Sequence, residues 1–206
     1  MSREIFEIVQ GMDLKNIETQ LALQCAPLIT GLKISNMLIV SNKDEKLSAD
    51  NFKNEQVFLA IVFYRMKRRS RFFCSAEINW RNFLEREDVS EVLREEGYVE
   101  IQLGRILSIF QMRYRAYMNG SKIFPHEMGL LLGYPVEDVT GFMVHGGKNS
   151  LYSGYWKVYA DVARKLEIFK QFEMAKEMLI RLVSSGVSME EIIGYYNENT
   201  LQTAVV

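Results

Sequence analysis

Hydrophobic residues in the first third of the chain follow first helical and then extended spacing. An apolar stripe at helical intervals follows Asp13 and ends before Pro27, which predicts a capped helix from Leu14 to about Cys25. Stretches dense in β-branched and aromatic residues then predict strands. These strands are Ile34–Val40, Gln56–Tyr64 and Arg71–Ile78, with a polar loop at Ser41–Glu55 and a hairpin tip at Arg65–Ser70.

Helical spacing dominates the rest of the chain. It predicts short helices that end at Gly97, a helix over Val99–Met118, a helix pair at Pro125–Gly133 and Pro135–Val144, a long helix over Trp156–Ser184, and a last helix from the Ser188 and Glu191 capping box to Tyr196. The segment His145–Gly154 predicts a Gly-rich loop. Together these elements predict an α+β fold in one domain over residues 1–206. A small antiparallel sheet from the N-terminal third, within 1–79, is covered by the helical C-terminal two-thirds, 80–206.

Composition and charge narrow the range of functions. The 206 residues are 48% hydrophobic, enough to bury a core without disulfides or metals. The 25 basic and 26 acidic residues give a net charge of −1, whereas a dedicated non-specific nucleic-acid binder is usually clearly basic. No signal-peptide pattern and no membrane-length apolar run is visible, which predicts a cytoplasmic protein without a membrane partner. The two cysteines, Cys25 and Cys74, match no metal spacing and fit a reducing compartment.

Three sequence blocks carry a family resemblance. They read FPHEMGLLLGYPVEDVTGF at Phe124–Phe142, GYWKVY at Gly154–Tyr159, and LALQCAPLITGLKISN at Leu21–Asn36. These blocks resemble the signature of a family of uncharacterised cytosolic proteins from anaerobic Gram-positive bacteria, filed as a domain of unknown function. Members often carry a histidine where this chain has Gln24. The resemblance implies a cytosolic bacterial protein and supplies no activity.

The helix pair around Gly133 has the spacing of a helix-turn-helix motif. Gly129 supplies a small residue where two helices would cross, and Val139 anchors the second helix. A DNA-reading helix usually presents lysine or arginine, but this one begins with the carboxylates Glu137 and Asp138. The charge therefore favours a structural αα-hairpin over a DNA-binding element.

A ligand site is predicted where Gly154–Tyr159 meets Pro125–Tyr134. Three aromatic residues around one lysine in the first segment suit a flat ligand, although aromatics at a helix start more often anchor that helix to the core. The candidate ligand-binding residues are His126, Glu127, Tyr134, Tyr155, Trp156, Lys157 and Tyr159.

Two further clusters are candidates for chemistry. Cys25 could act as a nucleophile if His126 lay beside it, although buried cysteine is more often structural. The hairpin tip could bind anions or the phosphates of nucleic acid, or it could be a solvated turn that protects strand edges. Its cations are Arg65, Lys67, Arg68, Arg69 and Arg71.

For each of these groups of residues, a structural role is favoured over a functional one. The leading interpretation is therefore a non-catalytic binding or regulatory module. Its predicted partner is a protein or small molecule of unknown identity, its cofactor is unknown, and no metal site is indicated. One alternative is a small thiol-dependent or redox- or iron-linked enzyme that uses Cys25 and His126. The other is an anion or nucleic-acid binder that uses the tip Arg65–Arg71, which the net charge does not favour.

Overall fold

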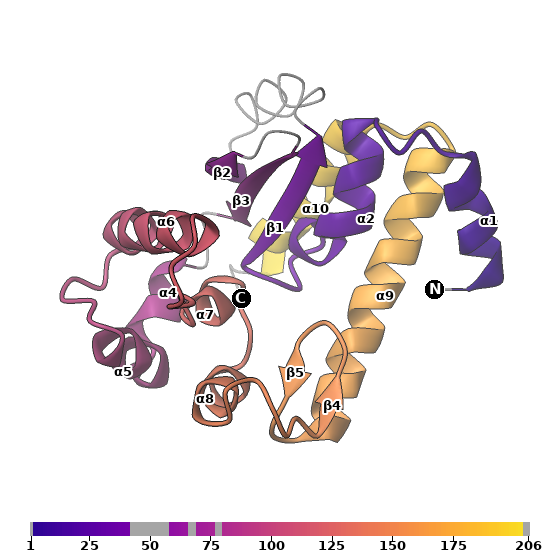
Figure 1. Ribbon diagram of the computed structural model, residues 1–206. Helices are drawn as coiled ribbons and strands as arrows, with labels where there is room; N and C mark the ends of the chain where they lie inside the picture. The colour runs from indigo at the N-terminus through magenta and orange to yellow at the C-terminus, as the bar shows by residue number, and fades with distance from the viewer. Residues whose placement is uncertain (1, 42–57, 66–68, 77–79, 204–206) are drawn as a thin grey trace. The chain divides into compact units, whose positions relative to one another are not determined.

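A computed structural model describes residues 2–41, 58–65, 69–76 and 80–203 and shows an α+β fold, as predicted (Figure 1). The chain forms two compact units. Unit 1 comprises Met1–Ala76 with Lys170–Val206, and unit 2 comprises Glu77–Phe169. The sequence pattern did not predict that Lys170–Val206 would group with the N-terminal residues. The single domain over 1–206 stays a prediction.

Unit 1 contains a three-stranded antiparallel sheet in the order β1-β3-β2. The strands are β1 (Ser35–Ser41), β2 (Phe58–Arg65) and β3 (Arg69–Ala76). Each predicted strand is confirmed to within two residues. The pairing of β2 with β3 also confirms the predicted hairpin, while the predicted loop at Ser41–Glu55 lies almost wholly outside the described residues.

One face of this sheet packs against helices. Unit 1 holds α1 (Arg3–Gly11), α2 (Ile17–Ile29), α10 (Met189–Thr203) and, from Lys170 onward, the long helix α9 (Val162–Ser184). Leu38 of β1 and Phe72 of β3 join the side chains of α2, α9 and α10 in one hydrophobic core. Burial of this apolar surface is the main source of stability for unit 1.

The boundaries of α2 differ from the prediction. Asn16 caps the helix, because its Oδ1 accepts the Glu18 N–H at 2.7 Å, while Asp13 accepts the Lys15 N–H in the turn before it. Pro27 does not end the helix, which continues to Ile29. A proline in the last turn removes one backbone donor, and the burial of Leu28 and Ile29 outweighs that loss.

The last helix begins as predicted. The backbone N–H of Ser188 donates to Glu191 Oε2 at 3.0 Å, and the Glu191 N–H donates to Ser188 Oγ at 3.2 Å. This reciprocal pair confirms the capping box. The helix continues past the predicted end at Tyr196 to Thr203.

Unit 2 is mainly helical. Its helices are α4 (Trp80–Glu85), α5 (Glu87–Glu95), α6 (Leu103–Met118), α7 (Met128–Leu131) and α8 (Val136–Val144), followed by the first turns of α9. Gly97 has φ +85° and follows α5, which confirms the predicted helix end. α6 starts at Leu103 rather than Val99, whose side chain is 93% exposed. No helix in the described ranges combines the length and the hydropathy needed to cross a bilayer.

The predicted helix over Trp156–Ser184 is wrong in its first turns. Strand β5 (Lys157–Val158) lies there and pairs with β4 (Tyr152–Ser153) of the predicted Gly-rich loop, and α9 begins only at Val162. The N–H groups of Tyr159 and Ala160 donate to the Asp138 carboxylate instead of entering a helix. A tertiary contact therefore overrides the helical spacing of the aromatics.

The αα-hairpin is confirmed, with a shorter first helix that starts at Met128 rather than Pro125. Gly133 has φ +69° and makes the turn. A Cβ atom on Gly129 would lie 2.7 Å from Val139 Cγ2, closer than carbon atoms approach without displacement. The absent side chain therefore allows α7 and α8 to meet.

We expect Gly129→Ala to destabilise unit 2 by about 1–3 kcal/mol, because the new methyl group overpacks the contact with Val139. Urea unfolding of the full chain measures this change. Gly104→Ala in α6 is the matched control, since a Cβ there meets no atom within 4 Å. The control should be neutral or slightly stabilising, and equal stability of the two variants would contradict the packing argument.

Candidate functional site

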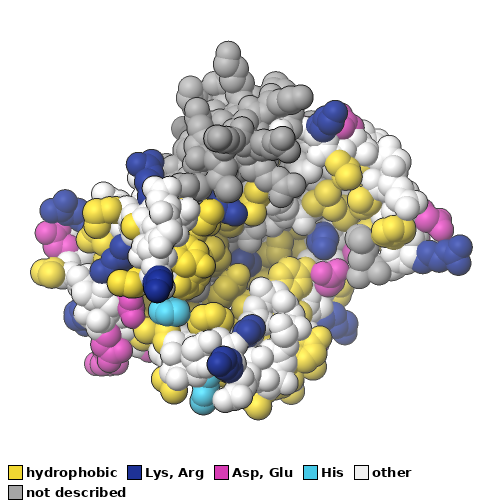
Figure 2. Space-filling view, in the orientation of Figure 1, with side chains coloured by type: hydrophobic (Ala, Val, Ile, Leu, Met, Phe, Trp, Pro, Cys, Tyr) yellow, Lys and Arg dark blue, Asp and Glu magenta, His cyan; other side chains and the backbone are white. Residues whose placement is uncertain are grey.

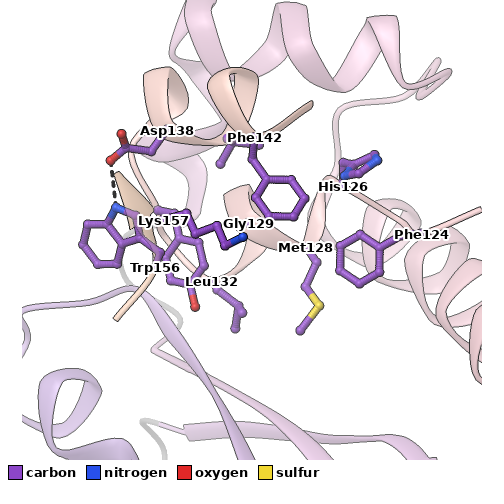
Figure 3. A pocket seen from close by; sticks show the side chains of 11 residues that line it. Phe124, His126, Met128, Gly129, Leu132, Asp138, Phe142, Trp156 and Lys157 are labelled. Atoms are coloured by element: carbon purple, nitrogen blue, oxygen red, sulfur yellow. Dashed lines mark hydrogen bonds between the residues drawn. The ribbon is translucent and has the colours of Figure 1, made fainter. Parts of the chain in front are cut away.

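A pocket of about 290 Å³ lies within unit 2, where the two predicted blocks meet (Figure 3). Its wall is mostly apolar and aromatic. The lining residues are Phe124, His126, Met128, Gly129, Leu132, Tyr134, Asp138, Val139, Phe142, Trp156 and Lys157. Four predicted ligand-binding residues are therefore brought together: His126, Tyr134, Trp156 and Lys157. Ligand binding by this pocket stays a prediction.

Aromatic rings form both ends of the pocket. At one end, Trp156 stacks on Tyr134, with ring centroids 5.0 Å apart and an interplanar angle of 26°. The edge of Trp156 also meets Phe169, at 4.5 Å between centroids. At the other end, the His126 ring lies 5.4 Å from Phe124 and 5.8 Å from Phe142 (Figure 3). These contacts fix the ring planes that a flat ligand would face.

The Asp138 carboxylate holds the Trp156 end in place. Its Oδ2 accepts the Trp156 Nε1–H at 2.7 Å, and its Oδ1 accepts the Tyr159 N–H at 2.7 Å and the Ala160 N–H at 3.3 Å. Asp138 is 2% exposed and stands in the first turn of α8. One buried side chain thus joins α8 to the β4–β5 segment.

A buried lysine balances this charge. Lys165, in the first turns of α9, is 1% exposed; its Nζ donates to Glu137 Oε1 and lies 3.9 Å from Asp138 Oδ2. Burial alone would raise the pKa of Glu137, but the hydrogen bond from Lys165, a backbone hydrogen bond and the charges of Lys165 and Arg164 together outweigh burial and lower it. Both carboxylates at the start of α8 therefore contact a cation of their own unit, as expected for a structural hairpin.

Two further polar side chains line the pocket. The Lys157 side chain is exposed; its Nζ donates to the Gly147 carbonyl and lies 5.9 Å from the centroid of the Phe142 ring. His126 Nδ1 is buried and has no hydrogen-bond partner among the described residues. Figure 2 shows that both histidine side chains reach the molecular surface. Recognition of a polar substituent by Lys157 and His126 stays a prediction.

The remaining predicted ligand residues lie outside the pocket lining. Glu127 is fully buried and accepts the Tyr98 hydroxyl at 2.8 Å and Arg113 Nη1 at 3.0 Å. Burial and the hydrogen bond to Glu127 raise the pKa of Tyr98. Tyr155 packs against Phe169, with ring centroids 5.5 Å apart. Tyr159 stacks on His145 at 5.6 Å, and its Cβ would lie 2.5 Å from a Cβ placed on Gly141.

The other sequence candidates fall elsewhere. Cys25 belongs to unit 1 and His126 to unit 2, so a Cys25–His126 pair stays a prediction. Residues 66–68 of the basic tip lie outside the described ranges, and anion binding by Arg65–Arg71 also stays a prediction. In the described part of the chain, no three His, Cys, Asp or Glu side chains gather closely enough to hold a metal.

The structure brings together two cysteines that the sequence analysis treated as separate. Cys25 and Cys74 are both free and fully buried. A hydrogen bond with Cys25, together with burial, raises the pKa of the Cys74 thiol. Nearby, burial lowers the pKa of Lys33 to about 8. No sequence spacing links Cys25 to Cys74, because their proximity depends on the packing of α2 against the sheet.

We expect Asp138→Asn to destabilise the protein by about 2–4 kcal/mol, because the amide replaces an acceptor with a donor and leaves Lys165 without a buried charge partner. The Trp156 environment should also become more polar, which shifts tryptophan fluorescence to longer wavelength. Urea unfolding and emission spectra measure the two effects. Asp161→Asn, at an exposed position, is the control; a loss there as large as at Asp138 would contradict this account.

We expect stability to rise with pH through Lys33. An unfolded lysine has a pKa of about 10.4, so between pH 8 and pH 10.4 the unfolded chain binds more protons than the folded one. Relative to Lys33→Met, the wild type should gain about 2 kcal/mol between pH 7.5 and pH 9.5. Urea unfolding at both pH values tests this, with the exposed Lys122→Met as a control that follows the wild type. A constant difference between wild type and Lys33→Met would show that Lys33 is not shifted.

Comparison with known proteins places the chain. No curated protein matches it significantly, and no solved structure does so either. A family model described as "Protein of unknown function (DUF3793)" matches residues 21–193, which include all three blocks noted in the sequence. The match spans well over half of the 206 residues. The chain therefore belongs to this family of proteins of unknown function.

Proposed function

We propose that this protein is a non-catalytic binding module whose ligand is a small, flat, mostly apolar molecule with one anionic substituent. The observation that supports this proposal is the unit-2 pocket, where stacked rings and one lysine line a single cavity. The sequence blocks at Pro125–Tyr134 and Gly154–Tyr159 both contribute to it.

The pocket is pre-organised, which favours binding. Asp138 fixes the Trp156 ring through its Nε1–H, and Tyr134 stacks on the same ring. A site whose rings are already held loses little side-chain entropy when a ligand enters. Rigid aromatic walls with a few polar groups are typical of small-molecule sites.

The size and chemistry of the pocket define the ligand class. Its volume of about 290 Å³ is at the lower end of ligand sites, which run from roughly 300 Å³ upward. This volume suits one or two fused rings. The Lys157 ammonium can pair with an anionic group, and the buried His126 Nδ1 can exchange one hydrogen bond with the ligand.

The buried carboxylates support binding rather than acid–base catalysis. Asp138 is occupied by the Trp156 indole and two backbone donors, and Glu127 lies outside the lining, bonded to Tyr98 and Arg113. A general base must reach the proton that it removes. Glu127 does not line the pocket, and both oxygens of Asp138, which does line it, already accept hydrogen bonds.

We expect the protein to bind indole-3-carboxylate saturably and neutral indole more weakly. Lys157→Gln should weaken binding of the carboxylate by about tenfold, or about 1.4 kcal/mol, and leave binding of indole unchanged. Ligand-observed NMR and calorimetry measure both affinities. The control is Lys148→Gln, since Lys148 is exposed and outside the lining.

Two results would count against this proposal. One is the absence of saturable binding of either compound by the folded wild-type protein. The other is equal weakening of both compounds by Lys157→Gln, which would show that the lysine supports the pocket rather than recognises a charge. Circular dichroism of each variant separates loss of binding from loss of fold.

A further inference from the structure

A second cluster of reactive side chains lies in unit 1 and is independent of the pocket. Cys25 comes from α2, Cys74 from β3, Asn36 from β1, and Lys33 from the turn between α2 and β1. Three of the four belong to the segment Leu21–Asn36. They meet on the helix-covered face of the sheet.

The strand register and one side-chain contact bring the two cysteines to the same place in the core. Asn36 is the direct partner of Cys74 in the β1–β3 ladder, so their side chains point to the same face. Asn36 Nδ2 lies 3.9 Å from Cys25 Sγ, and Cys25 and Cys74 belong to the same core cluster. Both cysteines are 0% exposed.

The turn after α2 brings a cation to this pair. Gly31 has φ +75° and reverses the chain, and the Lys33 N–H donates to the Pro27 carbonyl at 2.9 Å. Lys33 Nζ then donates to Asn36 Oδ1 at 2.9 Å, and its charge interacts with Cys25. An adjacent ammonium group stabilises a thiolate, which is the nucleophilic form of cysteine.

We propose that Cys25 and Cys74 form an oxidation site, at which a small hydroperoxide converts the two thiols into an intramolecular disulfide. Cys25 is the attacking residue, because Asn36, which accepts a hydrogen bond from Lys33 Nζ, contacts its sulfur. Cys74 is the resolving residue. Since both thiols are buried, the oxidant must be close to water in size, which selects hydrogen peroxide over bulky disulfides.

The chemistry balances in two steps. The neutral form of the Lys33 amine takes the proton of Cys25 and becomes the ammonium group, and the resulting thiolate attacks one peroxide oxygen. The S–O bond forms, the O–O bond breaks, and the leaving hydroxide takes the proton back from Lys33 as water. Cys74 Sγ then attacks the sulfenic sulfur of Cys25, the S–S bond forms, the S–O bond breaks, and hydroxide leaves with the Cys74 proton as a second water. Two electrons pass from the thiols to the peroxide.

The test uses the full folded chain, treated with hydrogen peroxide, quenched with catalase and alkylated in denaturant. We expect a mass loss of about 2 Da with no alkylation, and a Cys25–Cys74 cross-linked peptide after digestion. Glutathione disulfide should give no adduct. Cys74→Ser should instead accumulate a sulfenic acid at Cys25 that dimedone traps. Lys33→Met should slow disulfide formation at least about tenfold, while Lys122→Met should not.

Either of two results would overturn the proposal. The first is that native protein keeps both thiols at peroxide concentrations that oxidise them in urea. The second is oxidation of Cys25 to sulfinic acid without a cross-link to Cys74. If Cys74→Ser does not fold, the mass change of the oxidised wild type and the rate of disulfide formation in Lys33→Met still test the proposal. Failure of indole-3-carboxylate binding leaves this test unaffected, because the two sites share no residue.

Discussion

The Asp138 carboxylate is the interaction on which the candidate site depends. It satisfies three donors from one short segment, two of them backbone N–H groups and the third the Trp156 indole. An unpaired buried carboxylate would be costly, and Lys165 together with these donors removes that cost. The same bonds keep residues 159 and 160 out of a helix. One side chain thus determines both the backbone conformation of residues 159 and 160 and the orientation of the Trp156 ring in the pocket wall.

Local signals explain why much of the fold was predictable. The strands of unit 1 and the capping box of Ser188 and Glu191 depend on residues close together in sequence, and the structure confirms them. The close approach at Gly129 was also predictable. A glycine four residues before the turn at Gly133 supplies a small residue where the two helices cross. The errors at Pro27 and Trp156 have another origin. There, burial of Leu28 and Ile29, or bonds to Asp138, outweigh local preference.

The candidate site, like the fold, was predictable only where the signal is local in the sequence. The two unusual sequence blocks indicated where a pocket would form, and four of the seven named residues line it. Glu127 was misplaced because a carboxylate beside His126 gives no sign of its buried partners, Tyr98 and Arg113. Lys165 was missed because it lies on a long helix beside exposed basic residues such as Arg164 and Lys170, from which the sequence does not distinguish it. The meeting of Cys25 and Cys74 required the strand register, which composition and spacing do not contain.

The contact between Gly129 and Val139 has a consequence for how this pocket can change. Both residues line the cavity, and at their contact Gly129 has no side chain that could be shortened. Any larger residue at position 129 therefore pushes α7 and α8 apart unless Val139 becomes smaller. A relative that accommodates a larger guest without moving its backbone must trim flexible neighbours such as Met128 or Leu132. In such relatives, the choice of ligand would depend on the flexible side chains at positions 128 and 132, while the contact between α7 and α8 stays the same.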